Sequence, residues 1–522
     1  MKKESVPNNS FYNSNFKNKK ILIIVPHQDD ELFLCGTILD SLRKVTSNIY
    51  VAFVTNGDYG NDFNQRYIEC LSAMKIFQIS SKNVICLGYG DQYETKYGHI
   101  YHAPMEEIVM SKRGKKQTYG KDYIYSKYKI HHDYTLTNLY NDLEMMIREL
   151  WPDVIFCNDM DWHPDHRAVS LIFDRIIGRI LNSNYEYHPD IYKGFVYGFG
   201  WDGVDDYNIL NLRSTVKPKR SRCNDKRFEL NNPYYKWEER VRFPVSDELL
   251  SKRKNKLWKA IGKYRFSQNA KRFYNSMMNS DAVFWKRHTK NLAIQAHINV
   301  SSGNSDNLQD FVIMDSSDIL KSVDMPCDRG IWYPDMSDEE IFIKYYFESP
   351  VNPNKIILYR DVKSYGLTSI YGVLKYKGKG NVEYAFEIGK YDIKYEIDMF
   401  DAKDISFIEL NFQKSYQAFG FSEIEILENL KLPVYVKGMY TGNYIYHYYC
   451  EKSCEKMIIE YCCYPNDDIK IEIIEDDKSG SYIIGNTIIM TDCFKKIMLK
   501  LTSSFNNEVY DVITIERRNK NV

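Results

Sequence analysis

Two short polar clusters in the first third of the chain carry the side chains best suited to chemistry. PHQDDE at 26–31 directly follows the aliphatic run ILIIV, and NDMDWHPDH at 158–166 directly follows DVIFC. Imidazole and carboxylate groups together suit zinc with an open coordination position. Because a histidine or aspartate after a strand is more often a turn former or helix cap, only the pairing of the clusters favours a metal site. The candidates are His27, Asp29, Asp30, His163, Asp165 and His166.

The elements around these clusters predict an α/β fold. Between residues 20 and 180, short apolar segments alternate with segments of helical spacing. This alternation is typical of a Rossmann-like, mostly parallel sheet with helices on both faces. Ligands of such sheets bind outside the carboxyl ends of the strands, where both clusters stand. We therefore expect the clusters to meet in one crevice. The expected strands are 21–25, 49–54, the segment NVICLGYGD and DVIFCN, and the expected helices include one ending near Lys44, 62–79 and 136–150.

Residues 91–133 interrupt this alternation. The stretch is rich in tyrosine, lysine and histidine and is too long for an ordinary connection. We interpret it as a loop that covers the substrate, with a flexible insertion as the alternative. His131 and His132 could gate the site, although loop histidines are commonly just exposed, and His99 and His102 are no stronger candidates.

The second half of the chain has the pattern of an all-β structure. Short segments such as KIILYRDV, SIYGVLKY and ISFIELNF alternate or are rich in β-branched residues, as in an antiparallel sandwich. We expect a loosely ordered or disordered N-terminus at 1–18, the α/β part at 19–297, a β-sandwich at 298–428 and a small β-domain at 429–522. The abundant tyrosines could stack on sugar rings, but a scaffold or dimer contact is the favoured role of the sandwich. Oligomerisation through the β-domains is a further possibility.

Composition narrows the class of protein. The 522 residues are 44% hydrophobic, and 70 basic residues balance 70 acidic ones, which argues against a nucleic-acid partner. No apolar run approaches the roughly 18 residues of a membrane span, and the N-terminus has no apolar segment behind its basic residues, so we expect a cytoplasmic protein. Cys35, Cys86 and Cys157 have the apolar surroundings of reduced core thiols. The cluster Cys450, Cys454, Cys462 and Cys463 could hold a metal or a disulfide, but its spacing matches no common zinc module.

The two motifs resemble a known family. PHQDDE and HPDH, in that order after two strands, resemble the signatures of the LmbE-like (PIG-L) zinc-dependent N-acetyl-sugar deacetylases, as do TNGDYG and LGYGD between them. The resemblance covers roughly residues 19–290. Gln28 replaces the family's usual proline at a position that is not a ligand. Further along, SYQAFGFSEIEIL resembles the last strands of galactose-binding, discoidin-like sandwiches.

The resemblance implies a role for each motif residue. It implies one zinc ion per chain, or another divalent metal, held by His27, Asp30 and His166. Asp29 would be the general base and then the proton donor to the departing amine. A protonated His163 would stabilise the oxyanion, and Asp165 would orient it. Arg66 and Asp91 occupy positions where the family contacts substrate, and Glu31 would orient the ligands or cap the first helix.

The function expected from these motifs is removal of an acetyl group from an N-acetylated sugar or glycan, of N-acetylglucosaminyl type, by metal-activated water. One alternative is an amidase of the same metal chemistry that acts on a non-sugar N-acyl compound. The other is a carbohydrate-binding protein without catalysis. The complete set of motif residues argues against the last alternative.

Overall fold

The computed structural model describes most of the chain from residue 12 to residue 517. The ranges left out within it are 14, 61, 97–98, 162, 185, 198–233, 236–240, 245–254, 266–280, 314–329, 379, 400–401, 429–433, 437–439, 442–446, 451–452, 462–468, 477 and 503–509. Cys462 and Cys463 of the predicted cysteine cluster therefore lie outside the described residues.

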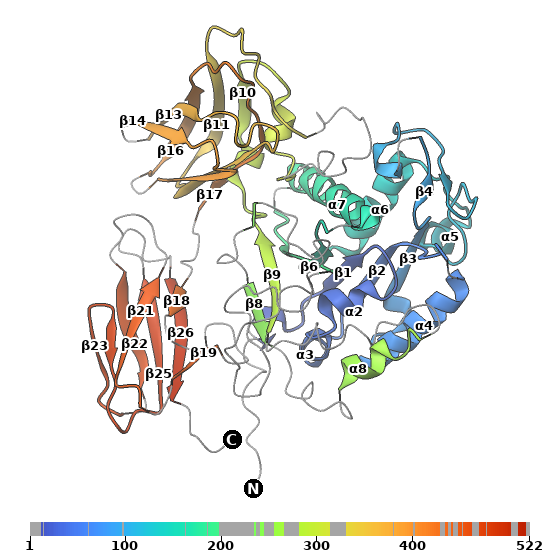
Figure 1. The fold of residues 1–522 in the computed structure, drawn as a ribbon, viewed down its shortest axis with the longest axis horizontal. Coiled ribbons are helices and arrows are strands. Elements are labelled where there is room, and N and C mark those ends of the chain that lie inside the picture. Colours follow the sequence, from blue (N-terminus) through green and yellow to red (C-terminus); the bar gives the residue numbers. More distant parts are fainter. Residues whose placement is uncertain are drawn as a thin grey trace.

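The first part of the chain is built on a seven-stranded sheet of order β3-β2-β1-β6-β7-β9-β8 (Figure 1). The first five of these strands are parallel, whereas β9 is antiparallel to β7 and β8 to β9. The predicted mostly parallel sheet is thus confirmed, with an antiparallel edge added. The strands are β1 (Ile21–Val25), β2 (Ile49–Thr55), β3 (Val84–Tyr89), β6 (Val154–Asn158), β7 (Asp190–Gly194), β8 (Val241–Pro244) and β9 (Asp281–Arg287).

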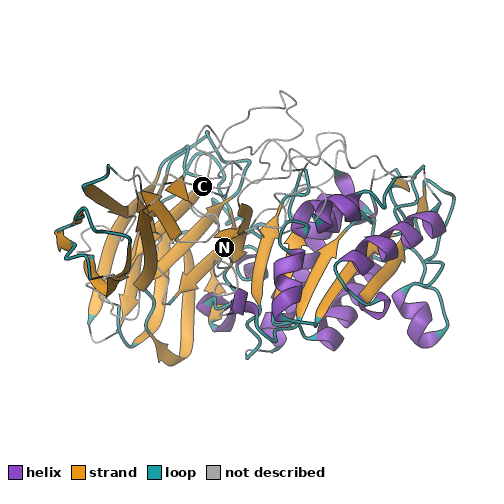
Figure 2. Cartoon of the chain, turned by 90° about the horizontal axis from the view of Figure 1, so that it is seen from below, coloured by secondary structure: helices purple, strands orange, loops and turns teal. Residues whose placement is uncertain are grey.

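Helices cover both faces of this sheet, as Figure 2 shows. β1 is buried along its whole length because its side chains enter two cores in alternation. Leu22 and Ile24 pack with α6 and α7, while Ile23 and Val25 pack with α2, α3, α4 and α8. The helices are α2 (Asp30–Cys35), α3 (Leu39–Val45), α4 (Phe63–Ile76), α5 (Tyr123–Tyr128), α6 (Leu136–Leu150), α7 (Pro164–Ser183) and α8 (Lys256–Ile261).

The insertion at 91–133 is packed against the α/β core. It contains the short strands β4 (Tyr93–Glu94) and β5 (Met110–Ser111), and its aromatic side chains Tyr93 and Tyr101 enter the core cluster below α6 and α7. Burial of these rings fixes the path of the insertion over the carboxyl edge of the sheet.

The N-terminal segment also contributes to the core where it is described. Tyr12 and Phe16 are buried, and the Phe16 ring lies against Phe156 and Phe243. Within the stretch expected to be loosely ordered, residues 12–18 thus include two packed aromatic side chains. The physical reason is that Phe156, Tyr192 and Phe243 leave an aromatic surface on one face of the sheet, which Phe16 covers.

The second part of the chain is all-β, as predicted. A five-stranded sheet of order β10-β11-β16-β13-β14 faces a three-stranded sheet of order β15-β12-β17, with one apolar core between them. The paired strands of both sheets are antiparallel. The strands are β10 (His297–Val300), β11 (Ile341–Val351), β12 (Lys355–Arg360), β13 (Ile370–Lys377), β14 (Asn381–Ile388), β15 (Lys394–Asp398), β16 (Ile405–Phe412) and β17 (Phe421–Leu427).

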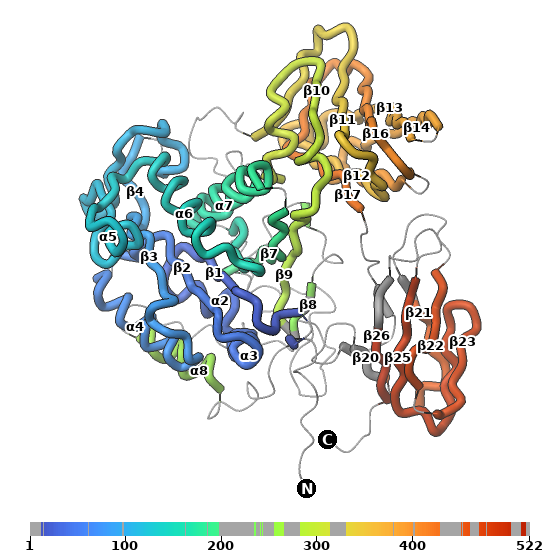
Figure 3. Tube along the Cα trace, turned by 180° about the vertical axis from the view of Figure 1, so that it is seen from behind, coloured from blue at the N-terminus to red at the C-terminus, as the bar shows by residue number. Residues whose placement is uncertain are grey.

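The remaining strands form two further sheets around a core of their own, beside the sandwich in Figures 1 and 3. β20 and β26 are parallel, and the other described pairs are antiparallel. No helix among the described residues has the length and apolar character needed to cross a membrane. The strands are β18 (Val434–Val436), β19 (Tyr440–Thr441), β20 (His447–Cys450), β21 (Lys456–Tyr461), β22 (Lys470–Asp476), β23 (Tyr482–Ile484), β24 (Thr487–Ile489), β25 (Lys496–Thr502) and β26 (Tyr510–Arg517).

The sandwich contacts α7 along a close, partly polar seam. A β-carbon at Gly178 would lie 2.1 Å from the carbonyl oxygen of Asp310, so a glycine is needed for this approach. Asp174, also on α7, contacts Lys193 at 3.0 Å and Arg287 at 3.1 Å, and all three side chains are buried. One carboxylate thus pairs with two buried cations beside the seam, and its removal would leave both without this partner.

Candidate metal centre and active site

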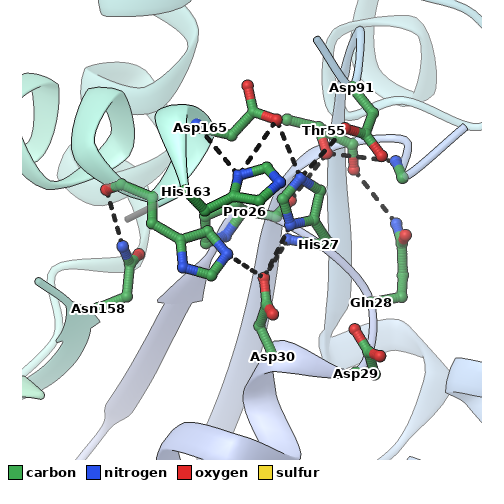
Figure 4. A network of polar contacts seen from close by, with 12 residues as sticks. Pro26, His27, Gln28, Asp29, Asp30, Thr55, Asp91, Asn158, His163 and Asp165 are labelled. Atoms are coloured by element: carbon green, nitrogen blue, oxygen red, sulfur yellow. Dashed lines mark hydrogen bonds and ion pairs between the residues drawn. The ribbon is translucent and has the colours of Figure 1, made fainter. Parts of the chain in front are cut away.

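The two polar clusters meet at the carboxyl edge of the sheet, as Figure 4 shows. His27 follows β1, Asp30 begins α2, and His166 lies in the first turn of α7. Asp30 Oδ2 lies 3.0 Å from His27 Nδ1 and 3.3 Å from His166 Nε2. Three residues from two distant segments thus direct one ligand atom each toward a common point.

The second contact of each histidine prepares it as a ligand. His166 Nδ1 lies 2.7 Å from the Asp161 carboxylate, so in the neutral ring, the form that can bind a metal, the proton is on Nδ1 and the lone pair on Nε2. His166 Nε2 is buried and forms no hydrogen bond with the described residues. His27 Nε2 similarly faces Asp165 Oδ2 at 3.1 Å, which leaves Nδ1 directed at Asp30.

The charge of this cluster also fits a cation. His27 contacts Asp30, Asp91 at 3.4 Å and Asp165, and all four side chains are buried. Burial opposes the charge of the imidazole, but the carboxylates of Asp91 and Asp30 raise the pKa of His27 well above its usual value. The carboxylates thus require a positive charge among them, which a divalent metal can supply.

Further groupings of potential ligands overlap this point. One ring nitrogen from each of His27, His163 and His166 lies within 4.8 Å of the other two. A second grouping within the same distance combines ring nitrogens of His27 and His163 with carboxylate oxygens of Asp91 and Asp165. Every residue expected to bind the metal therefore lies in the one cluster, with Asp30 joined to it through His27 and His166.

Asp29 stands beside this cluster in an unusual backbone conformation. Its φ is 105°, in the left-handed region, where aspartate is one of the better-tolerated side chains. Asp29 Oδ1 lies 3.0 Å from Arg66 Nη2. Burial raises the pKa of Asp29 to about 7, although Arg66 opposes the shift. A carboxyl group with a pKa near neutrality is suited to accept and return a proton.

Glu31 forms a hydrogen bond with the backbone of Asp29. Its carboxyl group accepts the Asp29 backbone N–H at 2.8 Å and the Tyr264 hydroxyl at 2.7 Å. Burial raises the pKa of Glu31 to about 8. The side chain is therefore engaged by its neighbours, in keeping with the structural role expected for it.

His163 differs from the expectation that it is protonated. Burial and the neighbouring His166 and His27 lower its pKa to about 4. His163 Nδ1 accepts the backbone N–H of Asp165 at 3.3 Å, so the neutral ring carries its proton on Nε2. The imidazole can still donate a hydrogen bond, without a positive charge.

Asp165 also has other partners than expected. Its carboxylate lies 3.8 Å from His163 Nδ1, beyond hydrogen-bond distance, but 3.1 Å from His27 Nε2 and 2.6 Å from His99 Nε2. The cause is the first turn of α7, which directs the side chain of Asp165 toward β1 and the insertion.

Arg66 and Asp91 both lie at the site. Arg66 is buried and donates to the carbonyl oxygens of Gln28 and Gly57 as well as to Asp29. Asp91 accepts the backbone N–H of Tyr59 at 3.3 Å. These contacts hold the side chains of Arg66, on α4, and Asp91, after β3, beside the site.

Gln28 and Asp161 show what the residue patterns left open. Gln28, where the family has proline, is buried and donates to the Thr55 carbonyl oxygen at 3.2 Å, so it links the loops after β1 and β2. Asp161, which turn chemistry alone explained in the sequence, accepts the His163 backbone N–H at 2.8 Å and contacts His166. Its place in NDMDWHPDH, two residues before HPDH, was the sequence feature that could have indicated a role in the site. His99 had no such signal.

Comparison with known proteins identifies part of the chain. Residues 22–177 match the family PIG-L, described as GlcNAc-PI de-N-acetylase. No curated protein matches this chain significantly.

Several solved structures are similar to parts of the chain. The lectin domain of lectinolysin complexed with Lewis B antigen is 16% identical, covers 27% of this chain and 99% of its own, and has a TM-score of 0.22. A Streptococcus pneumoniae fucose binding module is 11% identical, with 27% and 98% covered and a TM-score of 0.22. A conserved protein from Thermus thermophilus is 19% identical, with 34% and 66% covered and a TM-score of 0.22.

The matched family residues include β1, β6 and most of α7, which supply the two motifs. Residues 22–177 of this chain therefore form a PIG-L (LmbE-like) domain.

Proposed function

We propose that the protein is a zinc-dependent deacetylase that hydrolyses the acetamide of an N-acetylated sugar or glycan, of N-acetylglucosaminyl type. The observation that carries the proposal is the convergence of His27 Nδ1, Asp30 Oδ2 and His166 Nε2, with the Asp29 carboxyl group beside them. His27, Asp30 and His166 would hold the metal, a two-histidine, one-carboxylate set that leaves a position open. Zinc bound there would act as a Lewis acid and make a water molecule more acidic.

Asp29 carries the proton transfers in this proposal. Its carboxylate takes a proton from the attacking water as oxygen bonds to the acetamide carbon, and it returns the proton to nitrogen as the C–N bond breaks. The products are acetate and the free amino sugar. Arg66 Nη2, 3.0 Å from Asp29 Oδ1, would hold the Asp29 carboxylate in one orientation.

His163 would stabilise the negative charge on the carbonyl oxygen. Because its Nδ1 accepts the Asp165 N–H, the neutral ring carries its proton on Nε2, which would donate a hydrogen bond to the oxyanion. A neutral donor suits the low pKa of His163 better than the protonated form expected at first. Asp91, whose Oδ1 lies 3.4 Å from His27 Nε2, is proposed to contact the sugar hydroxyls.

The metal content of the purified protein tests the proposal without a choice of substrate. We expect about one zinc or similar divalent ion per wild-type chain, and its loss in His166→Ala. His188→Ala, in a histidine bonded to the Thr289 carbonyl oxygen and outside both motifs, is the matched control. Absence of metal after reconstitution would exclude the proposed deacetylase and leave the binding-protein alternative.

The choice between a sugar and another acylated amine rests on a release assay. Acetate is measured after incubation with N-acetylglucosamine, its oligomers and N-acetylated amino acids. Release from the amino acids alone would favour the amidase alternative. The family described as GlcNAc-PI de-N-acetylase supports the sugar.

One end of the sandwich supports a second function, contact with carbohydrate. The loops that follow β12, β14 and β16 lie at the same end, since Ile370 pairs with Ile388 and Gly372 with Phe412. They expose Tyr365, Tyr391 and Tyr416 at 44%, 64% and 112%. Exposed aromatic faces can stack on sugar rings.

One buried arginine forms hydrogen bonds with the backbone of these loops. Arg360 donates to the carbonyl oxygens of Ser364, Thr368 and Gly389. The exposed rings are thus mounted on ordered backbone. A glycan array with the Tyr391→Ala and Tyr416→Ala variants tests this function. Binding that survives both changes, or no binding by the wild type, returns the sandwich to a scaffold role.

We also propose that the chain divides into domains at 19–297, 298–428 and 429–522. A cytoplasmic location and no nucleic-acid partner are proposed with it. Separate apolar cores in the sandwich and in the C-terminal sheets support the division. The buried, unpaired thiols of Cys35, Cys86 and Cys157 suit a reducing compartment. Contact between copies through the β-domains is retained as a proposal.

A further inference from the structure

One buried histidine beside the site has no role in the mechanism above. His99 lies in the insertion, 66 residues before Asp165 in the sequence, and is 6% exposed. Its Nε2 lies 2.6 Å from Asp165 Oδ1, the shortest contact of that carboxylate among those described above. The insertion therefore reaches into the HPDH motif.

The contacts of His99 determine where its proton lies. Its Nδ1 accepts the backbone N–H of Tyr101 at 3.1 Å. Because a backbone amide can only donate, the lone pair is on Nδ1 and the proton of the neutral ring is on Nε2. His99 thus donates to Asp165, and the edge-on ring of Tyr93, 5.4 Å away, helps to keep the imidazole in this orientation.

The second oxygen of Asp165 continues the contact toward the metal cluster. Asp165 Oδ2 lies 3.1 Å from His27 Nε2, while His27 Nδ1 lies 3.0 Å from Asp30 Oδ2. A carboxylate that holds one nitrogen of a histidine fixes both the tautomer and the ring direction of a metal ligand. A displaced Asp165 would leave His27 free to rotate.

His99 also lines an open pocket beside the HPDH motif. The wall of this pocket is formed by residues around β4, by Lys112 after β5 and by Pro164 at the start of α7. Its lining residues are Gln92, Tyr93, Glu94, Thr95, His99, Lys112 and Pro164. One imidazole thus belongs to the pocket wall and to the chain of contacts that ends at His27.

We propose that His99 is a positioning residue of the active site, which holds Asp165 and through it the ring of His27. The inference rests on the proposed function, because it takes His27 as a metal ligand. It gives the insertion a role in the site besides that of the substrate-covering loop expected from the sequence.

Two variants separate this role from a structural one. In His99→Gln, the amide nitrogen can occupy the place of Nε2 and donate to Asp165. In His99→Asn, the shorter side chain can still accept the Tyr101 N–H but does not reach Asp165. Loss of a positioning partner lowers metal affinity or activity by about 10–100-fold. We therefore expect a weaker zinc affinity and a lower kcat in His99→Asn, and values close to wild type in His99→Gln.

Zinc affinity is measured by competition with a chelating dye, and kcat and KM by acetate release, with His188→Gln as the matched control. The opposite order, with Asn close to wild type and Gln impaired, would assign His99 to the local turn and overturn the proposal. Equal affinities in all variants would overturn it as well.

Failure of the proposed function is recognised separately, since it would show as absence of zinc from the wild type. In that case the 15N spectrum of labelled histidines in the metal-free protein decides. A hydrogen-bonded His27 Nε2–H signal that persists in wild type and His99→Gln but is lost in His99→Asn supports the proposal. An unchanged signal in both variants overturns it.

Discussion

Asp29→Asn is the variant that isolates the proposed base from the proposed ligands. Asn is isosteric, retains Oδ1 as an acceptor for Arg66, and tolerates the left-handed backbone at φ 105°. The fold and the ligands His27, Asp30 and His166 should therefore be unchanged. Removal of a general base costs about 10²–10⁴-fold in rate, or about 3–5 kcal/mol in transition-state stabilisation.

We expect kcat of Asp29→Asn to fall within that range while KM changes little and zinc remains near one per chain. Acetate release and elemental analysis of the same preparation give both quantities. Asp29→Ala is the comparison, because it also removes the partner of the buried Arg66 and should destabilise the protein. Wild-type turnover in Asp29→Asn with full zinc would refute the assignment of the base.

Three further outcomes test the buried charges and the contact between α7 and the sandwich. Asp174→Asn should destabilise the protein by about 3–5 kcal/mol in urea unfolding, since it leaves two buried cations without their carboxylate; a change below about 1 kcal/mol would contradict this. Burial opposes the charge of Glu425, but His288, 2.8 Å away, lowers the pKa of that carboxyl group below its value in the unfolded chain. The ion pair therefore stabilises the fold above the unfolded pKa, and this stabilisation is lost as pH falls through the folded pKa. Glu425→Gln should therefore show a smaller loss of stability on acidification than wild type below about pH 4–5, and identical acid profiles would contradict the ion pair. Gly178→Ala should lower the melting temperature because its methyl group meets the Asp310 carbonyl oxygen, whereas a rise would show that helix propensity, worth about 1 kcal/mol, prevails.

The cluster of histidines and aspartates that could bind a metal was predictable from the sequence because its residues lie close to regular elements. His27 and Asp30 follow a strand of purely aliphatic residues, and His166 stands two residues after Pro164 at the start of a helix. In a parallel sheet these ends share one edge, so the order of elements was sufficient to bring the motifs together.

The partners of the cluster could not be predicted in the same way. His99 lies in a stretch without periodicity, and its contact with Asp165 depends on how Tyr93 and Tyr101 are buried. Asp161 had an adequate explanation as a turn former, and only the observed contact with His166 distinguishes the two roles. Side chains that act through a ligand leave no spacing rule in the sequence.

The position of α7 connects these contacts with the rest of the molecule. His163 is its N-cap and its first turn supplies Asp165 and His166, while Gly178, about four turns after the N-cap, meets the sandwich. At 1.5 Å per residue the two regions are about 20 Å apart along the helix. The sandwich therefore does not touch the ligands through this seam. Its contribution is to fix the axis of α7, and a shift of that axis would change the direction of all three side chains relative to His27 at once.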